Sequence, residues 1–321
     1  MAKLGLMLES QENLNWDRLL NIAEKSEQLG FESLFLSDHL TSVKGNQKFN
    51  SVAIWPALTA VAMRTNRIRI GSLVCSMTFR HPAQLAKMSS AVEVLSAGRL
   101  DLGVGAGWYK HEHDMFGVDF PSSAQRLELL EDGIELIKHL WSGETTDFEA
   151  RHYKLSGAEM HPVPAQSHVP IIVGGMGNTT LKIAAAHADE WNSYYVSVGT
   201  YREKSKILDE HCASLNRNPV TLRHSLMTPF VIGEDDQQIG RHIAANRAVF
   251  PNLPTSLKEW QEAGFIGGSP QQLLDQIGVF EEAGISRFIL EHNSFDDPNP
   301  LELLAQKVLP YMNHDQFRSN R

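Results

Sequence analysis

The sequence predicts a single (β/α)8 TIM barrel that spans residues 1–321, for three reasons. Eight short runs of largely apolar residues alternate with segments of helical periodicity, as expected for parallel strands that are buried on both faces. A chain of 321 residues suits one such barrel. No GxGxxG motif follows the first apolar run, which disfavours the rival fold, a doubly wound open sheet.

The first strand–helix–strand unit lies near the N-terminus. An apolar run over Lys3–Leu8 predicts a strand, and Trp16–Leu29 predicts a helix because its apolar residues recur at helical spacing before a glycine. The run SLFLS over 33–37 predicts the second strand. We expect this strand to deliver Asp38 and His39 at its carboxyl end.

The same alternation continues to the end of the chain. Further strands are expected over 68–72, from 99 onward, and over 170–173, 190–192, 222–232 and 287–290. Further helices are expected over about 55–63, 82–95, 124–141, 180–188, 205–215, 270–283 and 301–309. The polar stretch over 153–167 predicts an irregular insertion.

Composition and charge exclude several classes of protein. The net charge of −9 argues against nucleic-acid binding, which requires clustered lysine and arginine. Cys75 and Cys212 are too few and too far apart for a disulfide framework. No stretch approaches the roughly 18 apolar residues of a membrane span, and the N-terminus lacks the pattern of a signal peptide. We therefore expect a cytoplasmic protein with neither nucleic acid nor membrane as a partner.

Two glycine-rich stretches follow predicted strands and indicate a ligand site. RLDLGVGAG over 99–107 has three closely spaced glycines, where the backbone is expected to approach something bulky. GGMGN over 174–178 precedes a helix, whose first N–H groups can bind a phosphate. The alternative for GGMGN is a tight turn, because phosphate sites in barrels more usually follow strands seven and eight. Together the stretches favour a long ligand with a polycyclic head and a phosphate tail.

Candidate chemistry lies just after the strands, because barrel active sites lie at the carboxyl ends of the strands. His39 suits proton transfer, since histidine titrates near neutrality. A metal site would need Glu9 and His292 to join Asp38 and His39, and nothing in the spacing demands this, so we expect no metal. The remaining alternative is a histidine that is hydrogen-bonded in the core.

Several aromatic residues fall where they can shape a slot for a planar ring, although each alone is more typical of core packing. They are Trp55, Phe79, Trp108, Tyr109, Trp191, Tyr194 and Tyr195.

These motifs resemble a known family. The stretches SDHL, TNRIRIGSLV, FRHPAQLAK, LSAGRLDLGVGAGW, VPIIVGGMGN and AHADEWN occur in family order over nearly the whole chain. The chain is identified by them as similar to the luciferase-like monooxygenase superfamily, in the branch of coenzyme F420-dependent oxidoreductases. The resemblance implies a (β/α)8 barrel with insertions, as in bacterial luciferase, and either FMN or the deazaflavin F420 as cofactor. We expect hydride transfer between F420 and a small organic substrate.

The resemblance also implies roles for residues near the cofactor ring. It places Asp38 and His39 close to the ring, with His39 as the proton donor. It places Leu73 and Val74, in a segment that often holds a non-proline cis peptide in this family, behind the ring together with Ser76.

Other roles concern the cofactor phosphate and a second acid–base group. The phosphate-holding loop of the family matches Gly174, Gly175, Gly177 and Asn178. Tyr109, His111 or Glu112 can supply a second acid–base group, and we take Glu112 as the catalytic candidate and Tyr109 as a cofactor contact.

Two positions depart from the sugar-phosphate dehydrogenases of this branch. Ala106 stands where those enzymes place a catalytic glutamate, and Tyr194 and Tyr195 stand nearest to the position of their phosphate-binding lysine. An apolar or aromatic substrate fits these departures better. The resemblance further implies a homodimer that buries barrel helices, to which the helix over 124–141 can contribute.

Two other functions remain open from the sequence. One is an FMN-dependent monooxygenase that uses reduced flavin, O2 and a reductase partner, since the carbon that replaces N5 makes F420 poor at oxygen chemistry. The other is a non-catalytic flavin-binding protein, which would lack a working acid–base group. The presence of His39 counts against this second alternative.

Overall fold

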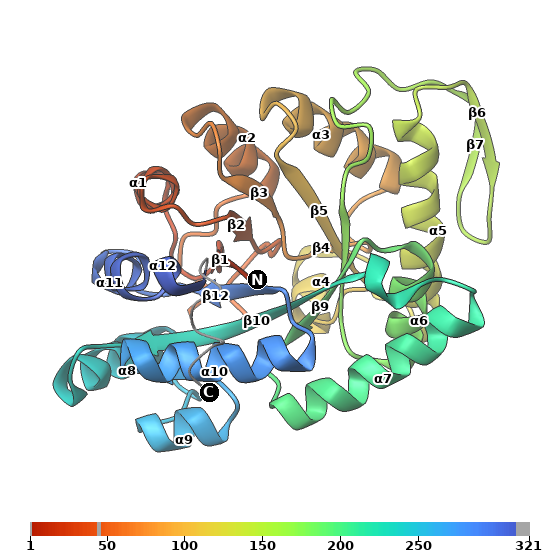
Figure 1. The fold of residues 1–321 in the computed structure, drawn as a ribbon. Helices are drawn as coiled ribbons and strands as arrows, with labels where there is room; N and C mark the ends of the chain where they lie inside the picture. The colour runs from red at the N-terminus through yellow and green to blue at the C-terminus, as the bar shows by residue number, and fades with distance from the viewer. Residues whose placement is uncertain (1, 44–45, 313–321) are drawn as a thin grey trace.

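Eight parallel strands close into a barrel, with helices around it, in the computed structural model, which describes residues 2–43 and 46–312 (Figure 1). Each strand pairs with the next in chain order, and the last returns to the first. The barrel strands are β1 (Lys3–Leu8), β2 (Ser33–Leu36), β3 (Arg69–Ser72), β5 (Leu100–Gly105), β8 (Ile171–Gly174), β9 (Glu190–Tyr194), β10 (Arg223–Ile232) and β12 (Arg287–Glu291). The predicted (β/α)8 barrel is confirmed.

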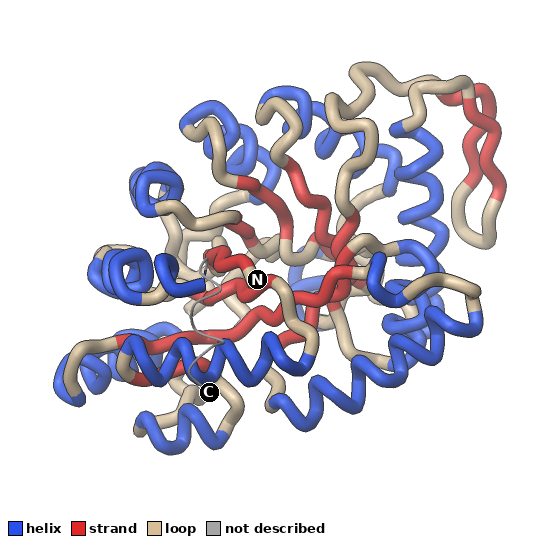
Figure 2. The backbone as a smooth tube through the Cα atoms, viewed as in Figure 1, coloured by secondary structure: helices blue, strands red, loops and turns tan. Residues whose placement is uncertain are grey.

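Helices surround the strands, which lie at the centre of the molecule (Figure 2). The longer ones are α1 (Trp16–Leu29), α2 (Ile54–Arg64), α3 (Pro82–Leu95), α5 (Ser123–Trp141), α6 (Asn178–His187), α7 (Val198–Ser214), α8 (Asp236–Val249), α10 (Pro270–Ala283) and α11 (Asn299–Lys307). Local signals set several ends: Asn15 caps α1, and Gly30 ends it with φ +87°. Ser269 and Gln272 form a capping box that starts α10. No helix of the described residues is long and apolar enough to cross a membrane.

Several elements differ from the prediction. The stretch expected to be irregular contains β7 (Lys154–Ala158), which pairs with β6 (Thr146–Glu149) in a hairpin that stands away from the barrel (Figure 2). Helix α7 begins at Val198 rather than near Ser205. Elements that the pattern did not indicate are β4 (Cys75–Ser76), α4 (Lys110–Phe116), α8, α9 (Leu257–Glu262), β11 (Ile266–Gly268), a 3-10 turn (Pro219–Thr221) and α12 (Leu309–Met312). Most of these are too short, or too polar, for periodicity to reveal them.

The barrel interior is built in layers. Along β12, alternate residues Arg287, Ile289 and Glu291 share one face, because side chains alternate along a strand. Ile289 belongs to a buried cluster with Phe35 and Leu73, contributed by other strands or strand ends. This apolar layer separates a charged cluster at the amino ends of the strands from the polar mouth at the carboxyl ends.

A buried ion cluster fills the amino end of the barrel. Arg287 is fully buried, and its guanidinium lies 3.0 Å from Asp101, 3.1 Å from Glu190 and 2.9 Å from Glu32. Arg69 also pairs with Asp101. Burial opposes the charge of Arg287, but Glu190, Asp101 and Glu32 together raise its pKa. This cluster therefore links β12, which carries the arginine, to the amino ends of β2, β5 and β9.

The glycines of β5 and the loop after it face the protein's own chain. A Cβ at Gly103 would lie 2.0 Å from the carbonyl oxygen of Ser72, and one at Gly105 would lie 2.7 Å from Val74. At Gly107, a Cβ would lie 2.4 Å from the Ser76 hydroxyl. The bulky neighbour predicted for this stretch is therefore the segment 72–76, and not a ligand.

Candidate active site

Asp38 and His39 follow β2 and make separate contacts at the mouth of the barrel. Buried Asp38 forms two hydrogen bonds with the guanidinium of Arg80, one of them 2.9 Å from Nη2 to Oδ1. Burial opposes the charge of Arg80, but the bonds and charge of Asp38 raise its pKa. The pair joins the loop after β2 to the loop before α3. The sequence prediction gave Arg80 no role, although it lies in one of the recognised motifs.

His39 forms a hydrogen-bonded pair with Glu112. Nδ1 of His39 donates to Oε2 of Glu112 at 2.9 Å, while Oε1 accepts from the backbone N–H groups of Leu40 and of Thr41. Glu112 is fully buried. Because a carboxylate only accepts, the pair assigns the proton to Nδ1 and leaves Nε2 for another partner.

The environment of His39 favours its charged form. Burial lowers its pKa, but the hydrogen bond and charge of Glu112, followed by the charges of Glu9 and Asp38, raise it above the ordinary value overall. Two rings stand beside the imidazole at right angles: Trp108 at 5.9 Å and Tyr109 at 6.4 Å between centroids. The imidazole of His39 is therefore surrounded by one hydrogen-bonded carboxylate and two aromatic rings.

The segment between β3 and β4 carries the cis peptide that the resemblance implied, between Leu73 and Val74. Leu73 packs into the barrel interior, and Val74 lies against the backbone of Gly174, where an added Cβ would be 3.0 Å away. The hydroxyl of Ser76, further along, is 2.7 Å from that of Thr78.

A chain of hydrogen bonds links this segment to Tyr109. The Thr78 hydroxyl lies 2.7 Å from Nε2 of His113, and Nδ1 of His113 lies 3.0 Å from the carbonyl oxygen of Tyr109. The ring of Phe79 stacks on His113 at 4.7 Å. Thr78 and His113, the latter in α4, therefore connect Ser76 to Tyr109 through hydrogen bonds.

The loop over 174–178 leads into the exposed N-terminus of α6. Gly175 has φ +136°, and its carbonyl accepts a 2.7 Å hydrogen bond from the Trp191 indole. Gly177 caps the helix, and its cap has no side-chain hydrogen bond. Asn178 begins the helix and accepts from His211 at 2.9 Å. The N–H groups of the first turn are therefore available to an anion.

A second polar group occupies the mouth near the barrel axis. Tyr195, with φ +52°, donates its hydroxyl to Oε2 of Glu291 at 2.5 Å. Burial, together with the charges of Glu291 and Glu9, raises the pKa of Tyr195 well above its ordinary value. Glu9 accepts from Gln11 at 2.7 Å. Strand-end position pointed to Glu9, whereas the bond between Tyr195 and Glu291 had no signal in the sequence.

His292 lies in a different environment from the other strand-end residues. Burial lowers its pKa to about 4, and its ring contacts Phe295. Within residues 2–43 and 46–312, no three His, Cys, Asp or Glu side chains are grouped so that they could hold a metal ion.

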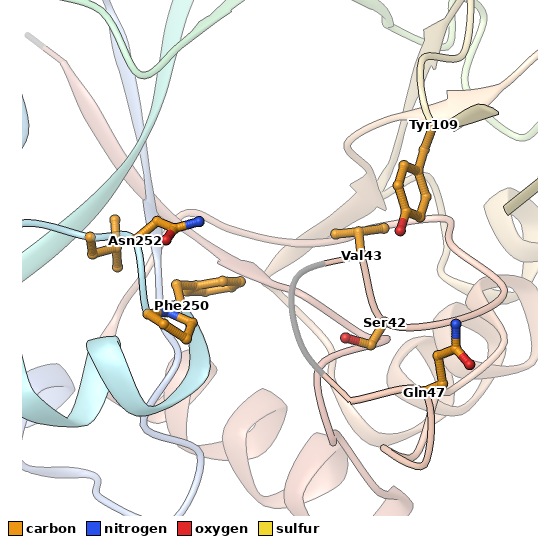
Figure 3. Close-up of a pocket in the computed structure, with 8 residues that line it drawn as sticks. Ser42, Val43, Gln47, Tyr109, Phe250 and Asn252 are labelled. Carbon is orange, nitrogen blue, oxygen red and sulfur yellow. The ribbon is translucent and has the colours of Figure 1, made fainter. Parts of the chain in front are cut away.

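A cavity of about 430 Å³ opens beside Tyr109. Ser42, Val43 and Tyr109 lie on one side of it, while Phe250 and Asn252, from the segment that follows α8, lie on the other (Figure 3). Its volume falls within the roughly 300 to 1,000 Å³ of small-molecule sites. Tyr109, whose ring centroid is 6.4 Å from that of His39, lines this cavity, whereas His39 and Glu112 are not among its described lining residues.

The closed barrel and the polar residues at its carboxyl ends define a (β/α)8-barrel protein with a candidate site in the mouth. The chain belongs to the luciferase-like monooxygenase family, whose model matches residues 1–287. The resemblance identified from the motifs is confirmed.

Similar proteins include several named as F420-dependent. An F420-dependent glucose-6-phosphate dehydrogenase of Microbacterium testaceum is 34% identical over 181 residues, which are 56% of this chain and 53% of that protein. The chain thus matches about half the length of that curated relative. One of the same name from Rhodococcus erythropolis is 31% identical, with 96% of this chain and 97% of the relative covered.

The fold is shared with solved structures of lower identity. An F420-dependent secondary alcohol dehydrogenase, in complex with an F420-acetone adduct, superposes with a TM-score of 0.81 at 20% identity. The match covers 96% of this chain and 98% of that one.

Proposed function

We propose that this protein is an F420-dependent oxidoreductase that transfers a hydride between F420 and a small organic substrate. The observation that carries the proposal is the hydrogen-bonded pair of partly buried His39 and buried Glu112, near the cavity that Tyr109 lines. The names of the relatives support the choice of F420. Bound F420 supplies a ring carbon that accepts or releases the hydride.

The residues around the mouth fit such a cofactor. The first turn of α6, with no side-chain bond at its cap, suits a phosphate held by Gly174, Gly175, Gly177 and Asn178. We assign Leu73, Val74 and Ser76 to the wall behind the ring, and Asp38 and Tyr109 to its surroundings. Arg80 keeps Asp38 in place through two hydrogen bonds.

His39 exchanges the proton with the substrate oxygen in this proposal. In carbonyl reduction its imidazolium form donates the proton, and in alcohol oxidation its neutral Nε2 accepts it. Glu112, fully buried and bonded to two backbone N–H groups as well, acts through His39 by orienting the ring and raising its pKa. We therefore retain Glu112 in the catalytic pair as the positioning residue.

Titration of the purified protein with F420 and with FMN tests the cofactor directly. We expect F420 to quench the protein's tryptophan fluorescence at concentrations about tenfold or more below those of FMN. Tighter binding of FMN would instead support the alternative, an FMN-dependent monooxygenase with O2 and a reductase partner. Binding of either cofactor without any turnover would support a non-catalytic flavin-binding protein.

Replacing Gly175 with valine should weaken F420 binding by about tenfold or more. Side chains rarely adopt φ +136°, and the new Cβ would lie 2.9 Å from Thr180, so the loop has to shift. Fluorescence titration measures the effect. Gly240→Val, in α8 and with open space around its Cβ, is the matched control. Equal affinity of the Gly175 variant and the parent would make the loop a turn without a phosphate role.

Replacing Glu112 with glutamine should move the pH profile of carbonyl reduction. The raised pKa of His39 keeps the imidazolium donor present beyond the ordinary pKa, and activity is lost as pH rises through the actual one. Without the carboxylate the pKa falls, so the alkaline limb of kcat/KM moves to lower pH. Turnover also falls, by up to the roughly 10²- to 10⁴-fold that acid–base catalysis supplies.

A matched control for this profile is Glu149→Gln, on the exposed hairpin. An unchanged alkaline limb in the Glu112 variant would show that this limb reports a group other than His39.

We further propose that the protein is a cytoplasmic homodimer in which barrel helices, α5 among them, form the interface. We expect light scattering at micromolar concentration to give the mass of two chains. The mass of one chain across that range would contradict the dimer.

A further inference from the structure

Trp191 of β9 holds the backbone of the loop over 174–178. Its side chain is fully buried, and its indole Nε1–H donates a 2.7 Å hydrogen bond to the Gly175 carbonyl. The N–H of Gly175 in turn donates to the carbonyl of Asn192 at 3.2 Å. Two neighbouring residues of one strand therefore fix both polar backbone groups of Gly175, where the loop turns with φ +136°.

The orientation of the indole is itself set by a buried aromatic cluster. The ring of Tyr201, in α7, stacks on Trp191 with centroids 5.7 Å apart and an angle of 12° between the planes. The ring of His224, in β10, meets Trp191 edge-on at 5.2 Å, and its Nδ1 lies 2.7 Å from the Tyr201 hydroxyl. Burial lowers the pKa of His224 to about 4 and raises that of Tyr201, so both side chains are neutral near pH 7. Contacts on its face and its edge therefore keep the indole N–H directed at Gly175.

Fixing the Gly175 carbonyl also fixes the peptide group that follows it. The peptide bond between Gly175 and Met176 is trans, so its C=O and N–H point in opposite directions. Because the carbonyl points toward the Trp191 indole, the Met176 N–H points to the other side of the loop. Gly177 and Asn178 then lead into the first turn of α6, whose N–H groups suit an anion.

We propose that Trp191 is a positioning residue for the cofactor phosphate: its indole N–H holds the loop over 174–178 in the conformation that binds the phosphate. The inference rests on the proposed function, because it takes this loop as the phosphate site. The indole has one donor, which Gly175 uses, so Trp191 acts through the loop and not on the phosphate itself. Loss of this N–H should therefore weaken the binding of flavins and deazaflavins that carry a phosphate, and spare those that do not.

Calorimetry on Trp191→Phe with two pairs of ligands tests this role. FMN is compared with riboflavin, and F420 with 7,8-didemethyl-8-hydroxy-5-deazariboflavin, which has the F420 ring and no phosphate. Phenylalanine keeps a ring against Tyr201 and lacks the N–H. In each pair that the parent binds, we expect the phosphate-bearing member to bind about 3- to 10-fold more weakly, the effect of one hydrogen bond. The phosphate-free member should stay within about twofold of the parent.

The matched control is Trp260→Phe. Trp260, in α9, is also fully buried, and its Nε1 donates to a backbone carbonyl, that of Ile266, at 3.1 Å. This variant loses the same kind of hydrogen bond outside the loop, so all four affinities should stay as in the parent. If Trp191→Phe does not fold, 3-benzothienylalanine is placed at position 191 instead, because it keeps the bicyclic ring and lacks the N–H.

The outcomes separate this inference from the proposed function. Equal losses for both members of a pair would make Trp191 a packing residue, and unchanged affinity for both would show that its hydrogen bond does not position the loop. Either result overturns the inference, as does a parent protein whose affinity does not depend on the phosphate. Failure of F420 alone to bind overturns the proposed function, while FMN and riboflavin still decide the role of Trp191.

Discussion

Replacing His39 with asparagine is expected to lower turnover by about 10²- to 10⁴-fold while leaving folding and most of the cofactor affinity intact. Proton transfer from a positioned group contributes a factor of this size, which corresponds to roughly 3 to 5 kcal/mol of activation free energy. Asparagine keeps an N–H donor for Glu112, so the buried carboxylate retains a partner. It has no group that titrates near neutrality.

Steady-state turnover, F420 affinity and the urea midpoint should be measured on the same preparation. His152→Asn is the matched control, because His152 pairs with Glu128 at 2.8 Å on the surface, away from the mouth. Turnover within about twofold of the parent would make His39 a packing residue. Glu9, Tyr109, Glu112 or solvent would then have to supply the proton.

Replacing Arg287 with methionine is expected to destabilise the protein by about 3 to 5 kcal/mol. The guanidinium is the shared partner of Asp101, Glu190 and Glu32, and methionine would leave these carboxylates in the barrel without it. Burial already raises the pKa of Glu190, and the charge of Arg287 opposes that rise. Asp101 keeps its pair with Arg69 and Glu190 keeps Arg223 at 3.4 Å, so the expected loss is that of the one buried cation that the three carboxylates share.

Urea unfolding measures this loss of free energy. Arg64→Met is the matched control, because Arg64 pairs with Glu24 at 3.0 Å on the surface, where an ion pair contributes about 1 kcal/mol or less. If the methionine variant does not fold, Arg287→Lys, which keeps the charge, should fold with an intermediate stability. A loss below about 1 kcal/mol in the methionine variant would show that the cluster is not needed for stability.

Helix boundaries were predictable where local chemistry sets them. Helices α1, α3 and α10 begin and end at the predicted residues, because caps, an initial proline or a closing glycine are local signals. Helix α8 was missed because its buried face carries polar side chains. Asn246 is buried there and bonds to the carbonyl of His242 and to Asn293, so hydrogen bonds replace the apolar periodicity that a prediction reads.

The sequence predicted the residues of the candidate site but not the hydrogen bonds between them. Strand-end position and motif similarity indicated His39, Glu112 and the loop over 174–178. The bonds from His39 to Glu112 and from Arg80 to Asp38 join segments far apart in the sequence, so only the closed barrel brings them together. The glycines of β5 illustrate the converse: their spacing was visible, but their neighbour, Val74, was not.

The two sides of the cavity differ in how they are attached to the barrel. The carbonyl of Tyr109 is hydrogen-bonded to His113 of α4, whereas the segment 250–253 lies in the connection between α8 and α9, where Arg247 donates to the Leu253 carbonyl. Exchange of that connection for one of another length or chemistry would therefore change one wall of the cavity and leave the wall that Tyr109 forms in place. Under the proposed function, a change of substrate is best sought by exchanging the connection between α8 and α9, with Arg247 retained to hold it.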